Sequence, residues 1–239
     1  MNRIMMTSLV GTVAAAALVV GAGAPAFAST STPRPSTKTT HTLESVQAAA
    51  KTATSKRETA LSAAIARLDA AKGISATDKA TLVDRLNADL TGMKAIEAKV
   101  GADTTLVTAS ADLKTVFTTY RVFGVAIPQA RIVADIDRAT SIEIPKLTAS
   151  QTKLAAMLAG KDASKSTAAL QSDLADMKAK IAAANTELSG ASEKVLAITP
   201  ADYNSNKTVV KSARASVKTA ENDLKQARAD RKAILTALK

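Results

Sequence analysis

In most of the segments after residue 43, apolar residues recur at spacings of three and four. This spacing places their side chains on one face of an α-helix and is typical of a heptad seam between packed helices. The clearest run is Leu170, Leu174, Met177, Ile181, Ala184 and Leu188. Strand patterns of alternating apolar and polar residues are nearly absent. The sequence therefore predicts an all-α chain.

Glycine, proline and capping residues divide this part of the chain into segments. Gly73 ends the first helix, Ser75 or Thr77 caps the second, Gly101 ends it and Asp103 caps the third. Pro145 should kink a later helix, because proline lacks the backbone N–H and clashes with the preceding turn. The expected helices cover 43–72, 78–101, 104–120, 128–160, 162–189 and 200–239. Short connections between them predict an elongated antiparallel helical bundle or coiled coil.

The first 28 residues match the pattern of a secretory signal peptide. Arg3 supplies the positive charge, Ile4 to Val20 is apolar, and Ala26-Phe27-Ala28 is a cleavage site. We expect cleavage after Ala28 and a secreted or extracytoplasmic protein, either released or held to the envelope without a covalent link. The alternative is an uncleaved anchor, although this apolar stretch is at the short limit for a bilayer span. No second apolar span follows, so no transmembrane segment is expected after cleavage.

The predicted organisation has three parts. Residues 1–28 are the signal peptide, residues 29–42 are a disordered Ser/Thr/Pro linker, and residues 43–239 are the helical domain. The linker has no apolar residue to bury, and its two prolines favour extended polyproline conformations.

Several chemistries lack the residues they need. The chain has no cysteine, which excludes thiolate nucleophiles, disulfides and cysteine-ligated metals. The one histidine, His41, lies in the linker, where it cannot be held rigidly enough for a catalytic triad. The chain also has no GxxxxGK[ST], GxGxxG or HExxH motif. We therefore predict a non-enzymatic protein with no catalytic residue, cofactor or metal; a carboxylate-dependent enzyme is the remote alternative.

The chain is strongly basic, with a formal charge of +11. Much of this charge falls on one side of the last apolar seam, which consists of Val210, Ala213, Val217, Ala220, Leu224, Ala227, Ile234 and Leu238, with Arg231 as an exception. We call the following residues the basic stripe: Lys207, Lys211, Arg214, Lys218, Lys225, Arg228 and Lys232. The opposite flank carries Asp202, Asp223 and Asp230.

The basic stripe is a candidate site for anionic cell-wall polymers, because regularly spaced cations can follow a polyanion. The alternative is a set of charged flanks that pair with neighbouring helices or are simply solvated. Nucleic acid is not an expected partner, since stacking aromatics are missing. Membrane insertion is disfavoured because the apolar face is mostly alanine and valine.

A second candidate site lies around residues 117–138. After signal cleavage the chain has four aromatic residues, and three of them lie within seven positions. The candidate cleft or partner contacts are Phe117, Tyr120, Arg121, Phe123 and Arg131. The alternative is that these large side chains fill a corner of the core. Arg131 and Asp135 are four residues apart and can pair. Asp135 and Asp137 are two apart, so on a helix they cannot face one substrate.

The order of these features carries a resemblance. An export signal, a Thr-rich linker and Ala-rich helices are followed by YRVFGVAIPQARIVADIDR and TPADYNSNKTVVKSARASVKTAENDLKQARADRK. In this order the chain resembles a group of secreted, Ala-rich, all-helical proteins of high-GC Gram-positive bacteria. The resemblance implies export and a helical fold. It implies no activity, and no functional residue is carried over.

These features predict an exported helical scaffold or binding protein at the cell envelope, acting through coiled-coil packing and a cationic surface. An extracytoplasmic adaptor that regulates an envelope enzyme through its coiled-coil face is the alternative. Self-association through the last helix also stays open, because a seam satisfied within one chain has the same sequence pattern as one that forms a dimer.

Overall fold

The computed structural model describes residues 41–239. In this range 86% of the residues are helical and none is in a strand, which confirms the all-α class. The predicted signal peptide, and the predicted linker as far as residue 40, lie outside the described residues. None of the helices between residues 41 and 239 combines the length and apolar character needed to cross a membrane.

Three helices pack against one another in the first part of this range: α1 (Leu43–Ala70), α2 (Ala76–Ala102) and α3 (Leu106–Thr118). Side-chain hydroxyls define where each begins, because the first N–H groups of a helix lack intrahelical partners. Thr42 accepts a hydrogen bond from the N–H of Ser45, and Ser75 accepts one from the N–H of Asp78.

The boundary between α2 and α3 differs from the predicted one. α2 continues through Gly101 to Ala102, and the N–H of Asp103 bonds to the carbonyls of Lys99 and Val100. Asp103 thus ends α2 rather than beginning α3. Thr105 caps α3 instead, by accepting a hydrogen bond from the N–H of Thr108.

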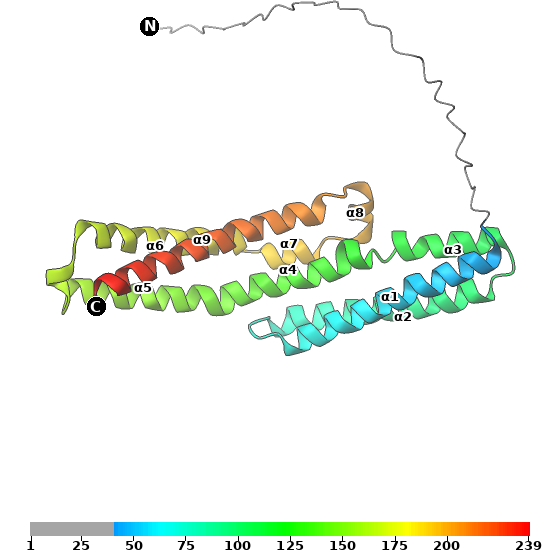
Figure 1. Cartoon of the computed structure of the whole chain (residues 1–239), viewed down its shortest axis with the longest axis horizontal. Coiled ribbons are helices and arrows are strands. Elements are labelled where there is room, and N and C mark those ends of the chain that lie inside the picture. The colour runs from blue at the N-terminus through cyan, green and yellow to red at the C-terminus, as the bar shows by residue number, and fades with distance from the viewer. Residues whose placement is uncertain (1–40) are drawn as a thin grey trace, which may run out of the picture. The chain divides into compact units, whose positions relative to one another are not determined.

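α3, α4 (Ile127–Arg138) and α5 (Ile144–Ala159) follow one another along one line (Figure 1). Two π-helical segments connect them, η1 (Val122–Ala126) and η2 (Ala139–Glu143). Arg121 enters η1 with a left-handed backbone, at φ 44°. At η2 the wider turn precedes Pro145, and the N–H of Ile144 bonds to the carbonyl of Ala139. Pro145 was predicted to kink or restart the helix, and the structure places it in the first turn of α5, directly after this wider segment.

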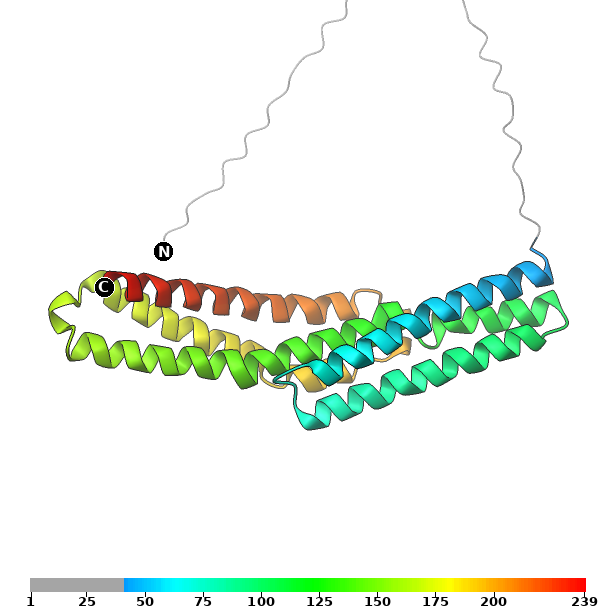
Figure 2. The ribbon, with the colours of Figure 1, turned by 60° about the horizontal axis from the view of Figure 1, so that its bottom comes forward.

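The chain returns through α6 (Ala168–Leu188), α7 (Ala191–Leu196), α8 (Pro200–Ser205) and α9 (Val209–Ala237). The 310 turn η3 (Ala163–Lys165) precedes α6, whose cap is Thr167 rather than the predicted Asp162 region. α6 and α9 pack along each other, and α5 lies against both. All six apolar positions of the seam in α6 are buried. Within the described unit, α1, α2 and α3 lie toward one end and α5, α6 and α9 toward the other, with α4 between them (Figure 2).

The predicted single helix over 200–239 is broken. It begins as expected, with Thr199 as cap and Pro200 in the first turn, but α8 ends at Ser205. The side-chain oxygen of Asn206 accepts hydrogen bonds from the N–H and hydroxyl of Thr208. This local turn replaces the helical bonding there, so Lys207 lies in a connection and not on a helix.

Candidate anion-binding groove

A groove of about 810 Å³ lies between α4 and the chain from α8 to the first turns of α9. We call it the α4–α9 groove. Four cations line it, together with one carboxylate and two aromatic rings. The cations are Arg131, Lys207, Lys211 and Arg214, the carboxylate is Asp135, and the rings belong to Phe123 and Tyr203. The tertiary structure thus brings part of the basic stripe beside residues of the second candidate site.

The charges in the groove do not cancel. Arg214 Nη1 donates to Asp135 Oδ2 at 2.6 Å, and Arg214 Nη2 lies 3.5 Å from Glu221. The hydrogen bond to Asp135 raises the pKa of the Arg214 guanidinium above its ordinary value. Asp135 therefore pairs with Arg214 rather than with Arg131, the partner the sequence had suggested. Among residues 41–239, Arg131, Lys207 and Lys211 take part in no salt bridge.

Tyr203 forms the aromatic end of the groove by packing directly onto η1. A Cβ atom at Gly124 would lie 2.9 Å from the Tyr203 ring, so glycine at this position allows the close approach. Lys207 Nζ lies 4.9 Å from the ring centroid and Arg121 Cζ lies 5.4 Å from it. These cations attract the ring by cation–π interactions and tie α8 to η1. Neither Tyr203 nor Gly124 was predicted as a site residue, although Tyr203 is the one aromatic residue of 41–239 outside the 117–123 cluster.

The second candidate set separates in the structure. Phe123 and Arg131 line the groove. Arg121 does not line it but contacts the Tyr203 ring, and its Nε donates to Asn204 Oδ1 at 2.6 Å. Phe117 and Tyr120 do not line it. Tyr120 packs so closely onto Gly92 of α2 that a Cβ atom there would overlap the ring.

Phe117 and Phe123 remain 42% and 45% exposed. Arg57 Cζ lies 4.5 Å from the Phe117 centroid and 5.2 Å from the Phe123 centroid, so one guanidinium contacts both rings. The core-filling interpretation therefore applies to Tyr120 but not to these two phenylalanines.

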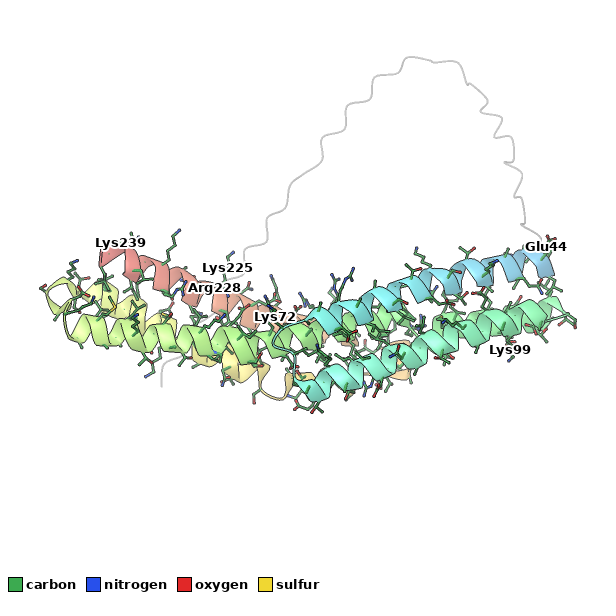
Figure 3. All side chains as sticks on the ribbon, turned by 90° about the horizontal axis from the view of Figure 1, so that it is seen from below. Glu44, Lys72, Lys99, Lys225, Arg228 and Lys239 are labelled. Carbon is green, nitrogen blue, oxygen red and sulfur yellow. The ribbon has the colours of Figure 1, made fainter. Side chains whose placement is uncertain are left out.

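The basic stripe is not a uniform cationic surface, although all seven of its side chains are exposed. Lys218 lies 3.5 Å from Glu221, and Arg228 donates to Glu143 at 2.8 Å. Lys225 and Lys232 form no salt bridge with any residue that the structure describes. Lys225 and Arg228 lie close together on α9 in Figure 3, but only Arg228 reaches an acidic partner on η2.

The acidic flank also divides. Asp223 pairs with Lys180 of α6 at 3.1 Å. Asp230 is buried and accepts a hydrogen bond from Gln226, while Asp202 caps α8. Burial raises the pKa of Asp230, and the nearby carboxylates of α6 add to the shift. Of these three acids, only Asp223 connects two helices, whereas Asp230 and Asp202 bond within their own helices.

Asp135 and Asp137 face different partners. Asp135 bonds to Arg214, whereas Asp137 is buried and bonds to Ser75 and Ser192. Residues 41–239 contain no group of three or more histidine and acidic side chains arranged to hold a metal ion. The comparison with known proteins finds no matching family model, curated protein or solved structure for this chain.

Proposed function

We propose that this chain is a non-enzymatic, exported binding protein that attaches to anionic polymers of the cell envelope through the α4–α9 groove. One observation carries the proposal: Arg131 from α4 and Lys207 and Lys211 from the other wall line one groove without acidic partners within residues 41–239. Cations gathered in a concave surface raise the local concentration of anions. The signal-peptide pattern and the resemblance to secreted proteins support the location.

The geometry favours an extended ligand with repeated charges. Lys211 lies in the first turn of α9, and Lys207 lies four residues earlier, in the connection before the helix. Successive phosphate or carboxylate groups can contact these cations in turn. Arg131 faces the same ligand from α4, so the polymer is held from two sides. An interaction of this kind weakens as salt screens the charges.

The helical packing supports this role by fixing the two walls of the groove. In this proposal the described helices form an antiparallel bundle, and the coiled-coil packing of α6 with α9 keeps the first turns of α9 opposite α4. The salt bridge between Arg214 and Asp135 adds a direct contact across the groove.

Sedimentation of the secreted chain, residues 29–239, with purified cell walls tests the proposal. The Arg131→Gln/Lys207→Gln/Lys211→Gln variant should lose most of its binding at moderate salt. The matched control, Lys153→Gln/Lys225→Gln/Lys232→Gln, removes three exposed lysines without salt bridges to residues 41–239 and should retain it. Equal losses of binding in the two variants would contradict the α4–α9 groove as the binding site. Equal binding of the wild-type protein at low and high salt would contradict the electrostatic mechanism.

A second candidate function is an adaptor that regulates an envelope enzyme. The exposed rings of Phe117 and Phe123 around Arg57 support it, because aromatic and arginine side chains are enriched at the centres of protein interfaces. Pull-down from an envelope extract should then recover a stoichiometric protein partner after the anionic polymers are removed. A Phe117→Ser/Phe123→Ser variant should lose that partner. Analytical ultracentrifugation of the secreted chain checks self-association.

A further inference from the structure

A second pocket, of about 370 Å³, opens between α2, η1 and the segment that joins α7 to α8. We call it the α2 pocket. Its walls are mainly apolar and include Leu82 and Leu86 from α2, Val125 from η1, and Leu196 and Ile198 from the connecting segment. Its volume lies in the range of small-molecule sites. None of the residues that line it lines the α4–α9 groove.

Two opposite charges also line this pocket. Arg85 and Asp89 lie four residues apart on α2, at a spacing that permits an ion pair. They form no salt bridge with each other, and Asp89 has no hydrogen-bond or salt-bridge partner between residues 41 and 239. Arg85 Nη1 instead donates to the carbonyl oxygen of Leu196, at 2.6 Å. The Arg85 guanidinium is thus directed toward the end of α7, and the Asp89 carboxylate is left without a counter-charge.

This arrangement costs free energy. Asp89 is partly buried, and burial raises its pKa to about 6. At neutral pH the carboxylate is therefore mostly ionised although it is poorly hydrated. Unpaired groups of this kind in a cleft are typical of binding sites, because a ligand can supply the missing partner.

We propose that the α2 pocket binds a small zwitterion with an apolar body, of the size and chemistry of an aliphatic α-amino acid. Its ammonium group pairs with Asp89, and its carboxylate pairs with the Arg85 N–H groups that Leu196 does not use. Its side chain packs against the apolar walls. The backbone positions of Arg85 and Asp89 lie about 6 Å apart along the helix axis, and the long arginine side chain adjusts to the ligand.

Isothermal titration calorimetry at neutral pH with three isosteric probes tests the assignment. L-leucine carries both charges, L-leucinamide only the ammonium, and 4-methylpentanoate only the carboxylate. Wild-type protein should bind leucine most tightly and each singly charged probe about tenfold more weakly, since a charged hydrogen bond contributes a free energy of about that size. Equal affinities for the three probes would reduce the site to an apolar cavity and overturn the proposal, as would no binding at all.

Variants separate the two charges. Asp89→Asn should weaken leucine and leucinamide about tenfold but not 4-methylpentanoate, and Arg85→Gln should weaken leucine and 4-methylpentanoate but not leucinamide. Asp84→Asn, which changes an exposed acid on the same helix outside the pocket, should leave all three unchanged. Thermal unfolding checks that each variant is folded. Tighter binding of leucinamide than of leucine would overturn the proposal that the ligand is a zwitterion and would indicate an organic cation instead.

Discussion

Asp137 Oδ1 on α4 accepts a hydrogen bond from the hydroxyl of Ser192 on α7, at 2.9 Å. Its other oxygen, Oδ2, accepts one from the N–H of Ser75, the residue that caps α2, also at 2.9 Å. One buried carboxylate thus connects three helices that are distant in the sequence. Eight residues earlier on α4, the side-chain amide of Gln129 donates to the carbonyls of Val195 and Ile198 and so fixes the end of α7 on α4.

Asp137→Ala should therefore destabilise the protein by about 3 kcal/mol, because it removes two charge-assisted hydrogen bonds and leaves the buried hydroxyl of Ser192 unpaired. Urea unfolding followed by circular dichroism measures the loss. Asp84→Ala, at an exposed position, should change the stability by less than about 0.5 kcal/mol. A loss at Asp137 no larger than that of Asp84 would show that the connection is not important for stability.

Gly124→Ala should displace Tyr203, because the added Cβ would lie 2.9 Å from the ring. We expect a destabilisation of about 1 to 2 kcal/mol and weaker binding to cell walls, measured by thermal unfolding and sedimentation. Gly101→Ala is the matched control. No atom lies within 4 Å of a Cβ at Gly101, and the residue is helical, so alanine there should stabilise by about 0.5 to 1 kcal/mol.

Asp89 should make stability depend on pH. Its pKa is about 6 in the folded protein and about 3.9 when unfolded, so between these values the folded state holds a proton that the unfolded state has lost. Protonated Asp89 therefore makes its full contribution to the unfolding free energy below pH of about 4, and this contribution is lost as the pH rises through about 6. Arg85 on α2 and Tyr120 beside η1 are the other charged and titratable residues that line the pocket.

Asp89→Asn should remove this dependence and stabilise the protein at neutral pH, by up to about 2 kcal/mol. The difference between wild-type and variant unfolding free energies, measured from pH of about 3.5 to 7.5, isolates the contribution of Asp89 from that of other acids. A difference that stays constant over this range would contradict the raised pKa.

The packing of α6 against α9 should depend on the buried apolar seam of α9 rather than on the charged residues of the basic stripe beside it. Leu224 is 1% exposed, so Leu224→Ala should cost about 3 kcal/mol through lost burial and the resulting cavity. Its neighbour Lys225 is exposed and unpaired within the described residues, and Lys225→Ala should cost less than about 0.5 kcal/mol. Chemical denaturation of the two variants measures both values. Similar losses of unfolding free energy would contradict the claim that the apolar seam stabilises this packing.

Local patterns were sufficient to predict most of the long helices and their buried faces. All six seam positions from Leu170 to Leu188 are buried, because spacings of three and four place side chains on one face of a helix. Ser75 and Thr199 cap helices as predicted, since their hydroxyls bond to N–H groups only three residues away. The break at Asn206 also depends on a local hydrogen bond, but the apolar spacing on both sides of it concealed the turn.

The chemical character of the two candidate sites was decided by tertiary contacts. The sequence by itself determined which residues are charged and that the chain is basic and helical. It did not determine that Asp135 pairs with Arg214 rather than Arg131, or that Glu143 neutralises Arg228 while Lys207 and Lys211 stay unpaired within the described residues. These outcomes depend on distances between side chains about 80 positions apart in the chain. Periodicity along one helix carries no information about such distances, so only the packed structure distinguishes a neutralised charge from one available to a ligand.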